Sequence, residues 1–554
     1  MLPEPHTKTF SSLVDEIKKG KIKIPQFQRD FVWTMQKSAG LIDSIIKGYP
    51  IGTFIFWRTK ERLRSVKDIG QQILPDPEAG ELVDYVLDGQ QRLTSLFASL
   101  QGIIIKREGS KEDDFSKIFI DLDAEESEQI VITDIEGKNQ ETLINVVALL
   151  TGNFILLASY HPKYHSKLNE YKNRIESYQY SIILVKDAPI NIATEIFTRI
   201  NVGGKPLSLF EIMAAKTFDY EKKFDLSEKF QELLNNLISL NYETISDTTV
   251  LQIISIILSK ECKRQVILQI NKNDFISVWA QAIDAIERTV EYFKNSYRIP
   301  VSQLLPYNAL IIPFSYFFFH HNDKPTGDKK KYLEDFFWRC SLSGRYSSAV
   351  ESKLAQDIKR IEQILSGELP SYDWSIDTSE EFVKNNGWFS AARSYIKAIL
   401  CIYAYHEPKS FNDNAIVNIG NYWLKQANSK NYHHFFPKAH LKTKNYDPFY
   451  INHILNITIV DDFLNKREIG AKAPSKYMTK FQQVNSSLDC TMMTHLIEDL
   501  NSFGIWDDDY DKFFNKRAEV ISRELSKRII KQEVDMKGQA NLVDDFDEEL
   551  TTVE

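Results

Sequence analysis

The stretch Val86-Leu-Asp-Gly-Gln-Gln-Arg-Leu-Thr94 decides the fold of the first part of this 554-residue chain. Its apolar start is typical of a buried strand, and Asp88-Gly89 predicts a tight turn into a helix. Gly89 would let backbone approach a ligand, and free N–H groups at the helix start attract an anion. Arg92 could add a bidentate phosphate contact, and Asp88 could hold a metal ion or accept a proton. A structural turn that caps a helix, with a structural arginine, is the alternative.

Helical and strand patterns alternate on both sides of this stretch, up to about residue 215. Apolar residues at helical spacing predict a helix over residues 35–47, which Gly48 and Pro50 end. A capping box, Ser208-x-x-Glu211, opens a later helix. Short β-type runs predict strands at residues 53–57, 83–87, 118–122 and 181–185. Residues 1–215 are therefore expected to form an α/β or α+β domain.

The strand pattern fades after residue 215, and helical periodicity continues to about residue 410. Residues 411–537 are less periodic at first and end in a charged helix from Tyr510 to about Lys531. Residues 538–554 form an acidic tail that is expected to be disordered. The sequence thus predicts an α+β multidomain protein, in which a mostly helical connecting region (216–410) joins two other domains.

Composition indicates a folded protein, since 43% of residues are hydrophobic and 26% are charged. The longest apolar stretches fall short of the roughly 20 residues that a membrane span requires. The N-terminus lacks the pattern of a secretory signal. The four cysteines lie far apart and form no C-x-x-C pair. We therefore expect a cytoplasmic protein with no membrane partner.

Charge is unevenly distributed along the chain. The net charge is -8, but residues 541–554 alone hold six acidic residues and no basic one. Residues 411–480 contain ten Lys or Arg and five Asp or Glu. Such a local excess is what phosphate binding requires, so the acidic whole chain does not argue against DNA as a partner.

Two further segments accompany the Asp88–Arg92 loop: Ile24-Pro-Gln-Phe-Gln-Arg-Asp-Phe-Val-Trp33 and Ile196-Phe-Thr-Arg-Ile-Asn-Val-Gly-Gly204. Together the three closely resemble a domain family with an I-P-x-[YF]-Q-R-x-[YF]-x-W opening, a D-G-Q-Q-R loop and a later F-x-R-[IV]-N segment. The resemblance covers about residues 7–215 and implies a ParB/sulfiredoxin-like α/β fold that binds a nucleotide. By matching positions, the pocket residues would be Gln28, Arg29, Asp88, Gly89, Gln91, Arg92, Arg199 and Asn201.

Two kinds of nucleotide chemistry are excluded in this domain. Sulfiredoxin chemistry needs a cysteine in the phosphate loop, and none of the four cysteines lies before residue 216. A P-loop needs G-x-x-x-x-G-K-[ST], whereas Gly203-Gly204-Lys205 is followed by Pro206. Use of an NTP, whose identity the sequence does not give, would therefore run through the Asp88–Arg92 loop.

The strongest chemical feature of the last domain is Asn431-Tyr-His-His-Phe-Phe-Pro-Lys438. Adjacent histidines on a strand point to opposite faces, so both rarely serve one core. The Phe-Phe-Pro bend could bring them to two sides of one phosphate site, and a structural pair is the alternative. Two asparagines, Asn456 and Asn465, follow in L-N-I-T-I-V and L-N-K-R-E-I-G.

This arrangement resembles the HNH, or ββα-metal, nuclease fold found downstream of D-G-Q-Q-R domains in GmrSD-type restriction systems. The resemblance covers about residues 415–535. It implies that His434 is the general base and that Asn456 orients His434 or braces the loop. His433 and Asn465 would bind a divalent metal ion, Mg²⁺ or Mn²⁺.

The chemistry of phosphodiester hydrolysis suits these residue types. A neutral imidazole can take a proton from water, and a cation stabilises the developing negative charge. The helix of residues 510–531, which contains Arg517, either lies along the DNA backbone or is a solvated amphipathic helix. Phosphate contacts are expected from Lys438, Lys442, Lys466, Arg467 and Lys472.

The sequence therefore predicts a nucleotide-regulated, metal-dependent DNA endonuclease of anti-phage defence. By resemblance, its substrate would be modified foreign DNA, such as phage DNA. One alternative is a ParB-like, nucleotide-switched DNA clamp with a vestigial nuclease domain, and another is a toxin-like nuclease. Assembly as a homo-oligomer is left open.

Overall fold

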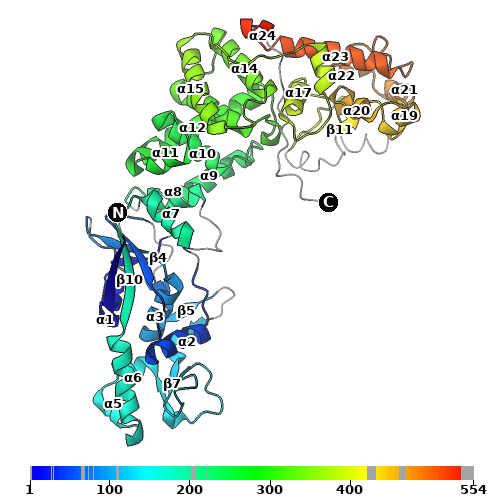
Figure 1. Cartoon of the computed structure of the whole chain (residues 1–554). Helices are drawn as coiled ribbons and strands as arrows, with labels where there is room; N and C mark the ends of the chain where they lie inside the picture. The colour runs from blue at the N-terminus through cyan, green and yellow to red at the C-terminus, as the bar shows by residue number, and fades with distance from the viewer. Residues whose placement is uncertain are drawn as a thin grey trace. The chain divides into compact units, whose positions relative to one another are not determined.

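The computed structural model of the chain divides into two compact units, Met1–Leu226 and Ser227–Glu554 (Figure 1). The first unit ends close to the predicted domain end at residue 215. The predicted connecting region, from residue 227 on, and the predicted C-terminal domain lie in the second unit, and a boundary between residues 410 and 411 stays a prediction. The structure describes residues 3–25, 28, 30–63, 69–72, 74–78, 80–107, 112–200, 208–219, 221–420, 432–460 and 469–537.

A five-stranded mixed sheet in the order β1-β10-β3-β4-β2 organises the first unit. β10 runs parallel to β3 and β4 runs parallel to β2, whereas the pairs β1–β10 and β3–β4 are antiparallel. The strands are β1 (Glu4–Thr9), β2 (Ile22–Lys23), β3 (Phe54–Thr59), β4 (Val83–Asp88) and β10 (Gln179–Lys186). Smaller sheets are formed by β5 (Ile104–Lys106) with β6 (Glu112–Asp114), and by β7 (Phe119–Asp121) between β8 (Val131–Ile132) and β9 (Leu143–Asn145).

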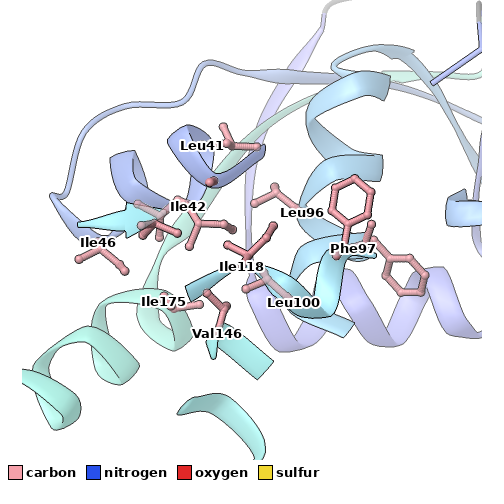
Figure 2. Packing of buried hydrophobic residues seen from close by; sticks show 14 of the residues in the cluster. Leu41, Ile42, Ile46, Leu96, Phe97, Leu100, Ile118, Val146 and Ile175 are labelled. Atoms are coloured by element: carbon pink, nitrogen blue, oxygen red, sulfur yellow. The ribbon is translucent and has the colours of Figure 1, made fainter. Parts of the chain in front are cut away.

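Five helices of this unit, α1, α2, α3, α4 and α6, bury apolar residues in one continuous core. Leu41, Ile42 and Ile46 of α2 lie beside Leu96 and Leu100 of α3 in Figure 2. The helices are α1 (Phe10–Lys18), α2 (Met35–Ile46), α3 (Gln90–Gln101), α4 (Val146–Thr151), α5 (Phe154–Ala158), α6 (His165–Ser177), α7 (Ile190–Ile200) and α8 (Leu209–Thr217).

The local sequence predictions for this unit are confirmed. The predicted helix over residues 35–47 is α2, and the four β-type runs become β3, β4, β7 and β10. The Ser208 side chain accepts from the Glu211 N–H, while the Glu211 carboxylate accepts from the Ser208 N–H. This reciprocal capping box starts α8.

The second unit is mostly helical, as predicted for residues 216–410. Its first helices are α9 (Leu226–Ile238), α10 (Asp247–Ser259), α11 (Arg264–Gln269), α12 (Lys272–Ser296), α13 (Ile311–His320), α14 (Gly327–Leu342), α15 (Val350–Ser366), α16 (Glu380–Asn386) and α17 (Ser394–Tyr405). The remainder comprises β11 (Tyr432–His434), α19 (Lys438–Thr443), α20 (Pro448–Ile451), β12 (Ile457–Ile459), α21 (Pro474–Val484), α22 (Leu488–Met493), α23 (Tyr510–Ser526) and α24 (Glu533–Lys537). β11 and β12 pair antiparallel, with α19 and α20 between them.

Within the described ranges, no helix combines the length and the apolar character that crossing a membrane requires.

The turn between β4 and α3 requires glycine. Gly89 caps α3 with φ +91°, in the left-handed region that other residues rarely adopt. A Cβ at this position would also lie 2.5 Å from Cδ1 of the buried Phe54 ring. The predicted strand–turn–helix is thus built by a residue that has no acceptable replacement.

We expect Gly89→Ala to destabilise the protein more than Gly137→Ala. Both glycines have positive φ, but a Cβ at Gly137 meets nothing within 4 Å. Gly137→Ala should cost about 1 kcal/mol of unfolding free energy from the backbone alone. Gly89→Ala should cost roughly 1–3 kcal/mol more because of overpacking. Urea unfolding of the two variants measures the difference, and equal midpoints would contradict the packing argument.

Candidate active site

Two glutamine side chains join the Gln28 segment to the β4–α3 turn. The Gln28 amide donates to the carbonyls of Val86 and Leu87, at 2.9 Å each. The Gln91 amide nitrogen donates to the Asp30 carbonyl at 2.8 Å, and its oxygen accepts from the Val32 N–H at 2.8 Å. The structure thus brings together the first two of the three motif segments.

The Arg92 guanidinium is largely occupied by the protein itself. It donates to the carbonyls of Ile51 and Thr53, at 2.7 and 3.0 Å, and to the Asp88 carboxylate at 3.0 Å. Its Cζ also lies 5.1 Å from the Phe54 ring centroid. These contacts are those of a structural arginine, which was the alternative interpretation of the turn. Asp88 and Arg92 form an ion pair at this junction.

The third motif segment is described only in part. Arg199 lies in the last turn of α7, where its side chain is 78% exposed and pairs with Glu195. Arg29 and Asn201, which were also predicted to line the nucleotide pocket, lie outside the described residues. The start of α3 has no side-chain cap. Of the described residues predicted for the nucleotide pocket, Arg199 is thus exposed, whereas Gln28, Gln91 and Arg92 are engaged within the protein.

The adjacent histidines of β11 face different surroundings, as alternation on a strand requires. His433 is 2% exposed, and its ring lies 6.1 Å from the Tyr477 ring and 6.4 Å from the Phe411 ring. His434 is half-buried, and its Nε2 lies 3.0 Å from Oδ1 of Asn452. The strand therefore places His434, rather than His433, at the more open surface.

Asn452 fixes the orientation of His434, a role that the sequence analysis offered to Asn456. The Asn452 amide nitrogen donates to the Phe389 carbonyl at 3.1 Å, which turns its oxygen toward the imidazole. An amide oxygen only accepts, so Nε2 of His434 carries the proton and Nδ1 keeps its lone pair. Burial and the nearby Lys438 lower the pKa of His434 to about 4, although the Asn452 contact raises it. The imidazole is therefore neutral near pH 7.

Asn456 braces the loop, which was the other role predicted for it. It is fully buried, and its amide nitrogen donates to the carbonyls of Phe436 and Ile451. Its oxygen accepts from the Phe436 N–H at 2.8 Å. These bonds hold the turn that follows β11 against the turn that precedes β12.

One wall of the site comes from the segment between α16 and α17. The Phe389 N–H donates to the Asn452 carbonyl at 2.9 Å, and the Ile454 N–H donates to the Gly387 carbonyl at 2.7 Å. A Cβ at Gly387 would overlap the His453 ring, so only glycine permits this pairing. The sequence analysis missed Gly387, Phe389 and Asn452, because the segments are more than sixty residues apart and share no local pattern.

Three of the predicted DNA-binding residues, Lys438, Lys442 and Lys472, are described and exposed. Lys438 begins α19 close enough to His434 to affect its titration, and Lys442 follows one turn later. Lys472 is exposed just before α21. Lys466, Arg467 and the predicted metal ligand Asn465 lie outside the described residues. In the described part of the chain, no group of three His, Cys, Asp or Glu side chains is arranged to hold a metal ion.

Neither alternative given for the helix of residues 510–531, contact with the DNA backbone or a solvated face, describes Arg517. Arg517 lies on α23 but is fully buried, and it donates to the carbonyls of His495 and Ile457. Arg528 is also buried and pairs with Glu524 at 2.9 Å. A helix that appears basic in sequence is here partly a core element, because its guanidinium groups satisfy buried acceptors.

The first unit is similar to a known family of domains. Residues 10–218 match the family described as GmrSD restriction endonuclease, N-terminal domain. This range agrees with the resemblance predicted for residues 7–215, and it covers the β4–α3 turn and its partners.

A relative extends the similarity to the second unit. An uncharacterised protein of Methanocaldococcus jannaschii is 25% identical over 87% of this chain and 88% of its own length. Because the alignment covers so much of both chains, it includes residues of both compact units.

Two buried histidines near the site should make the folded state acid-sensitive. His453 donates to the Lys384 carbonyl, and His495 contacts the Lys409 carbonyl. Burial lowers the pKa of both to about 4, below the value near 6.5 expected in the unfolded chain. The unfolded chain thus binds more protons, and stability present above pH 6.5 is lost as the pH falls toward 4.

We expect the loss to reach roughly 3 kcal/mol for each histidine, at about 1.4 kcal/mol per pKa unit. Chemical unfolding of the whole chain at pH 7, 6, 5 and 4.5 measures this dependence. His495→Asn should flatten it, whereas the same change at the exposed His165 should not. Equal unfolding free energies at pH 7 and pH 5 would contradict the prediction.

Proposed function

We propose that this chain is a restriction-type DNA endonuclease of anti-phage defence in which His434 is the general base. The observation that carries the proposal is the fixed contact between His434 and Asn452, beside the cationic Lys438. The match of residues 10–218 to the N-terminal domain of GmrSD restriction endonucleases supports the same function. The antiparallel pair β11–β12, with α21 following, supports an HNH or ββα-metal fold for the second part.

In this mechanism, Nδ1 of His434 accepts a proton from a water molecule. The resulting hydroxide attacks phosphorus, and the bond from phosphorus to the 3′ oxygen breaks. Asn452 orients the imidazole, since its oxygen accepts a hydrogen bond from the Nε2 N–H, while burial and the nearby Lys438 keep the ring neutral. Lys438 and Lys442 would hold backbone phosphates without reading the base sequence. Asn456 contributes by bracing the loop that presents His434.

We include a divalent ion, Mg²⁺ or Mn²⁺, in the proposal. His433 and Asn465 would hold it, and the ion would stabilise negative charge on the phosphorane and on the leaving oxygen. One imidazole and one amide leave positions for water and phosphate oxygens. His433 is 2% exposed among the rings of Phe411 and Tyr477 and faces different surroundings from His434, so its ring would have to turn toward the site to bind the ion.

Nucleotide binding by the first unit is a further part of the proposal, as is its ParB/sulfiredoxin-like fold. The uncapped start of α3, with Gly89 at its N-cap, supports an anion site there. Because Arg92 donates to backbone carbonyls, the exposed Arg199 would contribute the positive charge. Modified phage DNA as the substrate also belongs to this proposal.

His434→Ala should abolish DNA cleavage while the protein remains folded. Loss of a general base typically costs about 10²–10⁴-fold in rate. The measurement is cleavage of modified and unmodified phage genomes with Mg²⁺ or Mn²⁺, with and without NTP. His165→Ala, a change at an exposed histidine of the first unit, is the control.

Cleavage by His434→Ala at the wild-type rate would remove His434 from the mechanism. DNA binding without cleavage by the wild type would instead favour the DNA-clamp alternative. Toxicity of the wild type to its host without any phage would favour the toxin-like alternative.

Arg199→Ala should weaken NTP binding without loss of stability. The Arg199 side chain is 78% exposed, and its ion pair with Glu195 lies at the surface. In contrast, Arg92→Ala would remove the hydrogen bonds to the Ile51 and Thr53 carbonyls and lower the unfolding temperature. Loss of one charge-assisted phosphate contact typically weakens binding by about tenfold or more. Equilibrium binding of each NTP to wild type and to both variants measures the effect. Unchanged binding by Arg199→Ala would remove this residue from the nucleotide site.

A further inference from the structure

Trp388 is an exposed tryptophan beside the candidate active site. Trp388 is 39% exposed, although tryptophan is usually highly buried. One side of the indole faces the Phe449 ring, with centroids 6.2 Å apart and planes 23° apart. This stacking holds the indole in place while part of its surface remains open.

The backbone around Trp388 is tied to the segment that orients His434. Trp388 pairs across an antiparallel bridge with His453. The next residue, Phe389, accepts from the Asn452 amide, and Asn452 contacts His434. Two hydrogen bonds, from Asn452 to the Phe389 carbonyl and between Asn452 and His434, therefore connect the segment that bears Trp388 to the proposed general base.

Helix α19, which bears Lys438 and Lys442, packs against α20, which bears Phe449. The lysines of α19 attract the phosphates of a nucleic acid. The neutral ring of a base is the part of a nucleic acid that suits the open face of the Trp388 indole.

We propose that Trp388 is a stacking platform for one unstacked nucleobase of the DNA next to the phosphate that is cleaved. The inference rests on the proposed nuclease function and adds a base contact to it. Every base has a π face, so stacking on an indole tolerates any sequence. The contact would hold the strand in register while the lysines of α19 hold its phosphates.

The test is equilibrium binding of DNA in the His434→Ala background, in which binding can be measured without cleavage. Stacking contributes enough that Trp388→Ala should weaken binding roughly 5- to 150-fold. Trp388→Phe should retain most of the affinity, because a phenyl ring also stacks. Phe154→Ala, at an aromatic residue that is 85% exposed on α5, is the matched control and should change nothing.

Two further readouts separate stacking from a purely structural role. Trp388→Ala should leave the slope of log affinity against log salt unchanged, whereas Lys442→Ala should reduce that slope. DNA with an abasic nucleotide next to the cleaved phosphate should bind more weakly than intact DNA to the protein that keeps Trp388. Trp388→Ala should bind the two DNAs with nearly equal affinity. If Trp388→Ala is unstable, the same comparison of intact and abasic DNA can be made with Trp388→Phe.

The proposal that Trp388 stacks on a base would be wrong if Trp388→Ala and the His434→Ala protein bound DNA equally well. It would also be wrong if the abasic nucleotide weakened binding equally in both proteins. If the wild type cleaves DNA and this cleavage requires His434, such a result rejects only the stacking role of Trp388. If the wild type neither binds nor cleaves DNA, the proposed function itself fails.

Discussion

Backbone hydrogen bonds between residues 387–389 and residues 452–454 are the constraint on which the candidate site depends. They set the position of the Phe389 carbonyl, which turns the Asn452 amide toward His434. Gly387 is necessary for the pairing, because any side chain would overlap the His453 ring. The segment between α16 and α17 therefore forms part of the site wall. Residues 216–410 contribute structure to the candidate active site as well as connecting the two ends of the chain.

Sequence reasoning succeeded where structure is encoded locally. The helix over residues 35–47, the strand–turn–helix at Asp88–Arg92 and the Ser208 capping box each depend on neighbours within a few positions. It failed where function depends on contacts across the chain. Asn452 has no distinguishing local pattern, and its role follows only from a carbonyl more than sixty residues earlier. Asn456 was found from its spacing, but its bracing role became clear only from its burial and its partners.

Arginine residues also show that long-range contacts cannot be predicted from the local sequence. Arg92 and Arg517 look in sequence like phosphate contacts, yet both donate to backbone carbonyls. Arg339 is fully buried between the carboxylates of Asp335 and Asp535, which ties the start of α24 to α14. A guanidinium has five donors, and a buried one must satisfy them within the protein. Basic composition therefore indicates phosphate binding only for residues whose donors face solvent, such as Lys442 and Arg199.

Asparagine at position 452 suits the proposed role of His434 as a base that stays neutral. Its amide accepts from Nε2 of His434 and donates to the Phe389 carbonyl, and both bonds are needed to fix the orientation of the imidazole. An aspartate in the ionised form could accept from the imidazole but would face the carbonyl with a second acceptor. Its charge would also favour the imidazolium and so raise the pKa of His434. The neutral amide holds the ring equally well and leaves the Nδ1 lone pair available at neutral pH, which is the state that proton abstraction from water requires.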